Sequence, residues 1–257
     1  MNTSKKEERE GTIHTTRQGY TLKVIKYENN SNVYFIFDGD TIVRKAEWRE
    51  IVEGKVTNPI FPTVFGVGFI GEGIYKATIG NKHTKCYRDW KAILQRGCDE
   101  EYKRLHPTYK DVIVNPEVYN FQDFAEWWYN NYYKVEGEQM CIDKDILIKD
   151  NKEYGFNTMI FVPQRINKLF TKSDALRGDF PIGVSYHRNK YRATCSILNG
   201  NNKKQKFLGY YNSPEEAFEA YKTFKESYIK QIADEYKGRI PDRLYEAMYK
   251  WEVDIND

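Results

Sequence analysis

The chain has 257 residues, and at ~100–200 residues per domain this length predicts two or three small domains rather than one large core. The mean hydropathy is -0.77 and 30% of the residues are charged, yet aromatic residues at 16% supply enough apolar bulk for packed cores. The composition therefore does not favour disorder over the whole chain.

Membrane insertion and secretion are not supported by the sequence. No stretch approaches the ~18 uninterrupted apolar residues of a membrane helix, and the start, MNTSKKEEREG, lacks the apolar run of a secretory signal. We therefore expect a cytoplasmic protein with no membrane partner. The four cysteines are scattered, without a CxxC pair or metal-ligand spacing, which favours free thiols over disulfides or a zinc site: Cys86, Cys98, Cys141 and Cys195.

The first predicted domain, residues 1–62, is a small β module behind a charged, frayed leader. Residues 19–58 are predicted to form short strands, among them YTLKVIKY and NVYFIFDGDTIVR, with Asp38-Gly39 as a hairpin turn between apolar alternations. The stretch that follows, NPIFPTVFGVGFIGEG, is rich in Gly and Pro and is typical of a linker that runs into another strand. We place the domain boundary near Pro62.

The second predicted domain comprises residues 63–172. Apolar residues at helical spacing predict one helix over residues 85–105 and a second over residues 120–132. Segment 139–170 then predicts a strand, a polar loop, a strand and a short helix that starts near Pro163, which is a ββα order. The aromatic residues of the second helix are expected in the core rather than stacked on nucleic acid: Trp127, Trp128, Tyr132 and Tyr133.

The third predicted domain, residues 173–257, is a three-stranded sheet with a helix, which makes the fold class α+β and multi-domain. The helix begins at Ser213 as the N-cap, with Pro214 in the first turn and Glu216 completing a capping box. Its apolar stripe covers one face of the sheet and leaves the basic strand residues on the other face. A final amphipathic helix follows. The expected strands are 182–187, 190–198 and 203–211, and the final helix is roughly 241–251.

The net charge is only +3, but the charge is unevenly distributed. Residues 182–212 carry six basic residues and no acidic ones, whereas residues 213–237 carry six acidic and four basic residues. Side chains two apart on a strand point to one side, and the ~12 Å major groove of DNA admits strands as well as a helix. The segment therefore predicts a surface for double-stranded DNA, formed by Arg188, Lys190, Arg192, Lys203, Lys204 and Lys206.

This segment resembles the Apetala-type (ethylene-response-factor-like) DNA-binding domains. The resemblance covers about forty residues, PIGVSYHRNKYRATCSILNGNNKKQKFLGYYNSPEEAFEAYKTF, which follow the family's order of G-V, aromatic-basic-A, a turn, L-G-aromatic and an E-E-A-x-x-A-Y helix. It implies a sheet that docks in the major groove and reads DNA with basic and aromatic strand residues. The structural alternative is a solvated basic hairpin.

The central segment resembles the HNH endonucleases of phages, especially those with an Apetala-type domain behind the nuclease. The pieces that carry the resemblance are YRDWKAILQRGCD, TYKDVIVNPEVYNFQDFAEWW and CIDKDILIKDNKEYGFNTMIFVPQRIN. With the N-terminal β module, the resemblance spans nearly the whole chain.

The resemblance also assigns site residues. It implies that Asp143 and Asn167 hold a divalent metal, Mg or Mn, with Asp145 as a further oxygen donor. Lys144 occupies the position of the histidine that activates water. Because a lysine with an ordinary pKa near ~10.4 is a cation at pH 7, it can stabilise charge on phosphorus but cannot readily take a proton.

Two functions from different classes follow. The leading hypothesis is a sequence-preferring DNA-binding protein that is an HNH-type, homing-like endonuclease in the cytoplasm of a phage-infected host. The alternative is a catalytically silent regulator, or an inhibitor of a host protein, in which Asp143 is a turn carboxylate, Lys144 a solvated cation and Asn167 a helix-surface amide. RNA binding is less favoured, because the strands lack an interleaved aromatic platform for base stacking.

Overall fold

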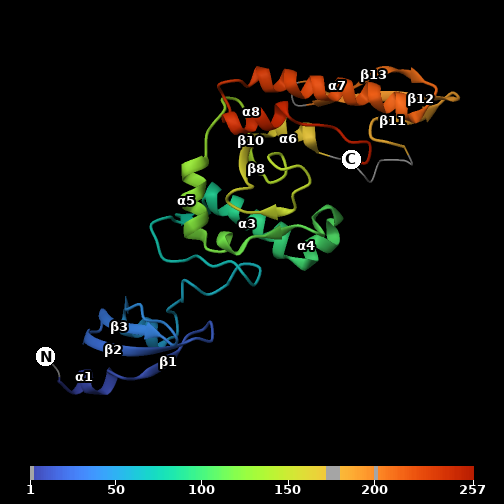
Figure 1. The fold of residues 1–257 in the computed structure, drawn as a ribbon. Helices are drawn as coiled ribbons and strands as arrows, with labels where there is room; N and C mark the ends of the chain where they lie inside the picture. The colour runs from blue at the N-terminus through green and yellow to red at the C-terminus, as the bar shows by residue number, and fades with distance from the viewer. Residues whose placement is uncertain (1–2, 172–179, 200–201) are drawn as a thin grey trace. The chain divides into compact units, whose positions relative to one another are not determined.

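The computed structural model describes residues 3–171, 180–199 and 202–257. The chain divides into two compact units: Met1–Thr63 with Phe69–Glu72, and Val64–Gly68 with Gly73–Asp257. Helices and several small sheets are combined (Figure 1), so the predicted α+β fold class is confirmed. The three-domain division stays a prediction. Within the described ranges, no helix has the length and apolar character needed to cross a lipid bilayer.

The first unit is built on an antiparallel sheet of four strands. In sheet order they are β1 (Ile13–Thr15), β2 (Thr21–Asn29), β3 (Asn32–Phe37) and β4 (Arg44–Ala46), followed by helix α2 (Trp48–Val52). Alternate side chains of β2 and β3 point to one face, as the period of two requires. They form the core with Ile51 of α2: Leu22, Val24, Val33, Phe35 and Phe37.

The predicted frayed leader is wrong, because these residues form helix α1 (Thr3–Arg9). The Arg9 guanidinium lies 4.8 Å from the ring centre of Tyr27 and 4.3 Å from that of Trp48. It also donates to the Tyr27 hydroxyl at 2.9 Å. Cation–π contacts at exposed sites contribute ~0.5–1 kcal/mol each, so Arg9 helps to hold the leader on the sheet.

The connection from β3 to β4 is longer than the predicted Asp38-Gly39 turn, because residues 38–43 separate the two strands. Asp40 stabilises this loop. Its Oδ1 accepts from the backbone N–H groups of the next two residues at 2.7 and 3.0 Å, and its Oδ2 accepts from Arg44 at 2.6 Å. A side-chain carboxylate thus replaces part of the backbone pairing of a tight turn.

The second unit begins with a short hairpin and three helices: β5 (Thr78–Ile79), β6 (Lys82–His83), α3 (Lys85–Cys98), α4 (Glu100–Leu105) and α5 (Phe121–Asn131), with 3-10 turns at Pro107–Tyr109 and Pro116–Val118. The single helix expected over residues 85–105 is divided at Asp99. The Asp99 carboxylate caps α4, because it accepts the N–H groups of Glu101 and Tyr102, both at 3.1 Å. Trp127 and Trp128 are buried, which confirms their expected place in the core.

The predicted ββα order is present. Strands β8 (Met140–Asp143) and β10 (Ile160–Pro163) pair in antiparallel fashion, and α6 (Gln164–Phe170) follows directly. The loop between β8 and β10 contains β9 (Glu153–Tyr154), which pairs in parallel with β7 (Ile113–Val114).

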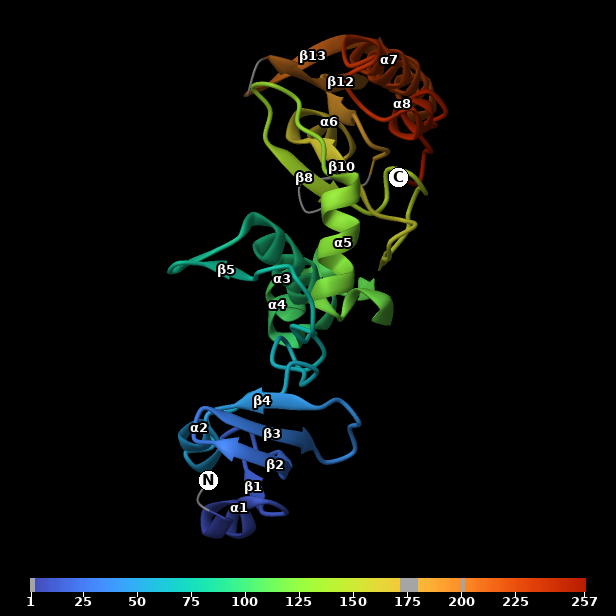
Figure 2. The same ribbon diagram turned by 90° about the vertical axis from the view of Figure 1, so that its left-hand side faces the viewer.

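The C-terminal part forms the antiparallel sheet β11 (Val184–His187), β12 (Lys190–Asn199) and β13 (Asn202–Tyr211), then α7 (Pro214–Glu235) and α8 (Asp242–Tyr249). Helix α7 runs along this sheet in Figures 1 and 2. Ser213 caps α7 as predicted, accepting the N–H of Glu216 at 3.1 Å. The capping box is shifted, because the Glu216 carboxylate accepts the N–H of Asn212 rather than that of Ser213.

Candidate nucleic-acid interface and acidic loop

One face of the β11–β13 sheet is covered by α7 and the other is open. Ala193 and Cys195 of β12 are buried, and Cys195 packs with Phe218 and Tyr221 of α7. Side chains alternate along a strand, so Arg192 points away from the helix. The pairs Ser185–Arg192, His187–Lys190 and Arg192–Tyr210 place their members on this same side. We call this surface the open face.

Aromatic side chains lie among the basic ones on the open face. Phe207 is 49% exposed and Tyr210 is 44% exposed, with ring centres 5.1 Å apart. The His187 ring is stacked toward Tyr210 at 6.1 Å, and the Arg192 guanidinium lies 5.8 Å from the Phe207 ring centre. The expectation that the strands lack an interleaved aromatic platform is therefore wrong.

A β-bulge explains why the sequence pattern concealed these aromatics. Ala193 pairs with Gly209 and Thr194 pairs with Phe207, so Leu208 is an extra residue in β13. Because of this extra residue, Phe207 and Tyr210 lie on one face although they are three positions apart. Gly209 has φ 144, a conformation that favours glycine. The LG step before an aromatic pair was the only signal in the sequence.

The six predicted basic residues do not share one face. Lys190 and Arg192 lie on the open face. Lys206 pairs with the buried Cys195 and lines a hollow beside Phe224 of α7, and Lys204 lies two residues earlier on the same side. Lys203 lies in β13, but its side chain is outside the described part of the structure.

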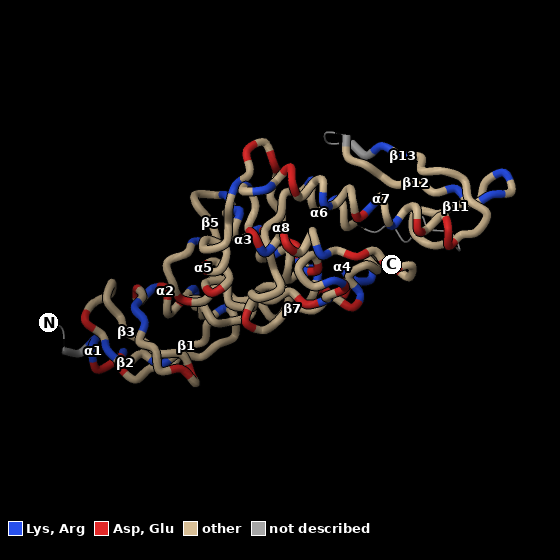
Figure 3. Tube along the Cα trace, turned by 45° about the horizontal axis from the view of Figure 1, so that its top comes forward, with Lys and Arg blue, Asp and Glu red and all other residues tan. Residues whose placement is uncertain are grey.

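Arg188 stands in the turn at the end of the hairpin rather than in a strand. Arg188 has φ 52 and Asn189 has φ 59, so both central residues are left-handed, as a type I′ turn requires. Basic residues are concentrated around this turn in Figure 3. Within the described ranges, no acidic side chain pairs with the cations at positions 188, 190 and 192.

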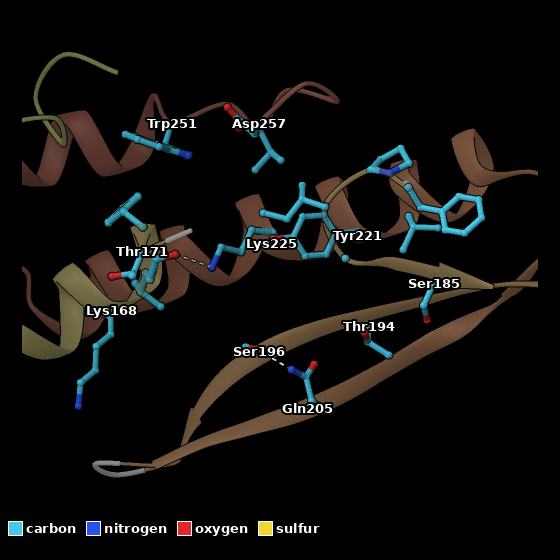
Figure 4. Close-up of a pocket in the computed structure, with 18 of the residues that line it drawn as sticks. Lys168, Thr171, Ser185, Thr194, Ser196, Gln205, Tyr221, Lys225, Trp251 and Asp257 are labelled. Carbon is cyan, nitrogen blue, oxygen red and sulfur yellow. Dashed lines mark hydrogen bonds between the residues drawn. The ribbon is translucent and has the colours of Figure 1, made fainter. Parts of the chain in front are cut away.

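A hollow of about 460 Å³ lies beside the same sheet (Figure 4). The Lys225 ammonium reaches across it from α7 and donates to the carbonyl of Leu169 in α6 at 2.7 Å. On the strand side, Gln205 donates to Ser196 at 2.8 Å. The lysine bond joins α7 to α6 and so connects the C-terminal sheet to the ββα region.

The second candidate site is the start of the β8–β10 loop, where Asp143 ends β8. Its Oδ1 accepts the backbone N–H groups of Asp145 at 2.9 Å and Ile146 at 2.8 Å, which is a carboxylate-stabilised turn. Asp143 is buried. Burial, together with the nearby charge of Asp145, raises the pKa of Asp143 to about 6.

Lys144 is not a solvated cation but a buried residue that closes the loop. Its Nζ donates to Asp145 Oδ2 and to the Asn151 carbonyl, both at 2.9 Å. The Asn151 amide in turn donates to the carbonyls of Lys144 and Glu153 at 2.7 Å. All these bonds stabilise the loop, so the Lys144 ammonium has a structural role in this conformation.

Asn167 lies on the Asp143 side of β8. Its amide donates to Cys141 Sγ at 3.4 Å, and Cys141 and Asp143 are two residues apart on one strand, hence on one face. Burial raises the pKa of the Cys141 thiol. Within the ranges described, no hydrogen bond joins Asn167 to Asp143.

As they stand, these residues do not fit a divalent metal ion. One Asp143 oxygen is held by two N–H groups, Lys144 occupies the Asp145 carboxylate, and the Asn167 amide faces a sulfur atom. A metal ion could bind both carboxylates, those of Asp143 and Asp145, only after it displaced the Lys144 ammonium from Asp145. Nor do three His, Cys, Asp or Glu side chains gather in metal-binding fashion anywhere in the described part of the chain.

Comparison with known proteins returns no match: no family model, no curated protein and no solved structure is significantly similar to the chain.

Proposed function

We propose that the protein binds double-stranded DNA through the open face of the β11–β13 sheet. The observation that carries this proposal is the placement of Lys190 and Arg192 with Phe207 and Tyr210 on one uncovered face of a sheet whose other face is closed by α7. The same face matches what the resemblance to Apetala-type domains implies.

The chemistry of this face suits a duplex. A guanidinium can donate two hydrogen bonds to a guanine edge, and a lysine neutralises a phosphate as a point charge. The half-exposed rings of Phe207 and Tyr210 offer apolar contact to thymine methyl groups and sugars. Because the phosphate contacts release counterions, affinity should fall steeply as salt rises.

The test is a titration of labelled duplex with the full chain, read by fluorescence anisotropy at several salt concentrations. Arg192→Ala should cost ~1–3 kcal/mol and relax sequence preference at one position, whereas Lys190→Gln should weaken all sequences alike and lower the salt slope by ~1. Lys204→Gln and Lys206→Gln are matched controls, because they remove the same charge from the other side of the sheet. A loss from Lys204→Gln or Lys206→Gln equal to that from Lys190→Gln would show that the open face is not the interface.

Cleavage of the bound DNA with Mg or Mn is a second candidate, implied by the resemblance to phage HNH endonucleases. One observation favours it: Asp143, Asp145 and Asn167 are gathered at the end of β8, where a metal ion could bind once Lys144 leaves the Asp145 carboxylate. Without cleavage, the chain would act as a DNA-binding regulator.

Incubation of plasmid and long phage DNA with either ion separates the two candidates. Nicking that Asp143→Asn and Asn167→Ala abolish, with DNA affinity retained, would support the nuclease. No nicking by the wild-type protein would favour the regulator. Nicking that survives both substitutions would place the active site elsewhere.

A further inference from the structure

We propose that the β5–β6 hairpin is a second DNA contact, which presses Ile79 into the minor groove and bends the duplex. This inference rests on the proposed DNA binding and extends it to a surface formed by other residues. Figure 2 shows the hairpin projecting from the helices that follow it.

The charge of this segment favours a polyanion. Residues 73–88 contain no Asp or Glu and four basic residues: Lys76, Lys82, Lys85 and Arg88. Lys85 is paired with Asp89 at 2.7 Å, but Lys76 and Lys82 are exposed and have no ion pair within the described ranges. This is the second acid-free basic stretch of the chain, after residues 182–212.

Two apolar side chains of this segment are exposed: Ile79 at the end of the hairpin and Ile74 at its base. Ile79 is 69% exposed and Ile74 is 85% exposed. Ile79 pairs with Lys82 across the hairpin, so an apolar group and a cation project on one side. Architectural DNA-binding proteins use this combination: cations hold the backbone while an apolar wedge unstacks a base step and kinks the duplex.

The tip is narrow and its conformation is fixed. Only two residues, Gly80 and Asn81, connect the strands, and of these only Gly80 has a positive φ, 58, which is typical of a type II′ turn. Behind the tip, Thr78 Oγ1 lies 3.2 Å from His83 Nδ1, within hydrogen-bond distance. Thr78 and His83 are paired across the hairpin, next to the pair Ile79–Lys82. Because adjacent pairs point to opposite sides of the ribbon, the Thr78–His83 contact lies on the face away from Ile79.

The base of the hairpin is anchored to two helices. The buried Gln122 of α5 accepts the N–H of Tyr75 and donates to its carbonyl, both at 3.0 Å, as a neighbouring strand would. Thr84, the N-cap of α3, donates to the carbonyls of Lys76 and Ala77 at 3.2 and 3.3 Å. Tyr75 also stacks on Tyr129 at 5.2 Å. A rigid base spares the hairpin an ordering cost when it binds.

Gly73, at the start of the hairpin segment, lies directly against the Gln122 side chain. A Cβ at this position would come within 2.2 Å of Gln122 Oε1, so the chain enters the hairpin at a point where only glycine leaves room for the amide. The hairpin is therefore presented by the fold in one orientation, with its apolar tip outward.

The experiment measures bending and base unstacking by the full chain. A duplex labelled at both ends reports bending by energy transfer, and 2-aminopurine at successive positions reports unstacking. Ile79→Ala should abolish most of the bend and the 2-aminopurine signal and raise Kd several-fold. Leu105→Ala, which truncates an exposed leucine elsewhere in the unit, is the matched control and should change neither.

The charge contribution is tested separately. Lys76→Gln with Lys82→Gln should reduce the slope of log affinity against log salt by ~2, whereas Lys110→Gln with Lys134→Gln, exposed lysines off the hairpin, should leave it unchanged. Circular dichroism melting checks that each variant is folded. Gln122→Ala should reduce bending although Ile79 is still present, because the hairpin loses the amide that fixes its base.

The outcomes distinguish this inference from the proposed function. Wild-type protein that binds duplex DNA through Arg192, but without bending and without any effect of the Ile79 and lysine changes, would overturn the hairpin contact and leave the open face in place. Wild-type protein that binds no duplex at all would overturn both.

Discussion

Phe207 and Tyr210 are three positions apart in β13, yet their rings lie 5.1 Å apart on the same side of the sheet. The extra residue Leu208 produces this relationship, because it shifts the alternation of side chains by one position. The bulge thereby adds an aromatic pair to a face that otherwise carries cations.

Truncation of either ring should weaken duplex binding. Phe207→Ala removes the ring beside the Arg192 guanidinium and should cost ~1 kcal/mol, or about fivefold in Kd, with little change in the salt slope because no charge is lost. Tyr210→Ala should act in the same direction. Anisotropy titration measures both effects. Tyr186→Ala is the control: Tyr186 is 54% exposed but pairs with Tyr191 on the other side of the sheet, and an equal loss from it would contradict the assignment.

Arg188→Gly should separate fold stability from DNA binding. A left-handed conformation costs a non-glycine residue ~1–2 kcal/mol, while glycine adds ~0.5–1 kcal/mol of unfolded-state entropy. The free energy of unfolding should therefore be unchanged or up to ~1.5 kcal/mol higher, and DNA affinity should fall. Urea denaturation and anisotropy measure the two quantities. Lower stability together with unchanged affinity would show that Arg188 serves the turn alone.

Asp143 should make stability depend on pH in the direction opposite to an ion-paired carboxylate. Its folded pKa, about 6, lies above its ordinary value of 3.8, so between these values the folded state binds more protons than the unfolded state. The contribution of this group is most favourable below pH ~4 and is lost as pH rises through 6, by up to ~3 kcal/mol.

Asp143→Asn should remove this dependence, since the amide oxygen can still accept the two N–H groups while carrying no charge. The variant should be more stable than the wild type at pH 7–8 and closer to it at pH 4. Denaturation at several pH values is the measurement. A variant less stable than the wild type at every pH would show that the ionised carboxylate is needed by the turn.

Lys144→Met should open the β8–β10 loop. Methionine keeps the apolar stem but removes the donor to Asp145 and to the Asn151 carbonyl, at a cost of ~1–3 kcal/mol. Amide exchange should increase over residues 144–153 and little elsewhere. Asp145→Asn, which retains an acceptor for the ammonium, should have a much smaller effect, and uniform exchange over the whole chain in both variants would contradict a local role.

The order of the elements could be predicted where one local pattern determines the structure. Ser213, Pro214 and Glu216 specify the start of α7 in the sequence, and alternate apolar residues place the core of β2 and β3. Apolar spacing alone did not predict the break at Asp99. The spacing of α3 continues into α4, but the Asp99 carboxylate caps the second helix and divides the two.

The candidate sites depended on features that spacing does not encode. The bulge at Leu208 and the turn at Arg188 changed which basic and aromatic residues share a face. The alternative of a solvated Lys144 is wrong because its partners, Asp145 and Asn151, become neighbours only when the loop closes. The helix of the leader depends in the same way on contacts of Arg9 with residues far along the chain.

Gln122 and Trp127 belong to the same helix, α5, and each holds a different part of the unit. Gln122 grips the base of the β5–β6 hairpin, whereas Trp127 donates to the Phe156 carbonyl at 3.1 Å and stacks on Phe161 of β10 at 5.4 Å. Because β10 pairs with β8, the contacts of α5 extend from the base of the hairpin to the strand that ends in Asp143. Helix α5 thus forms a continuous mechanical connection between the hairpin and the β8–β10 sheet.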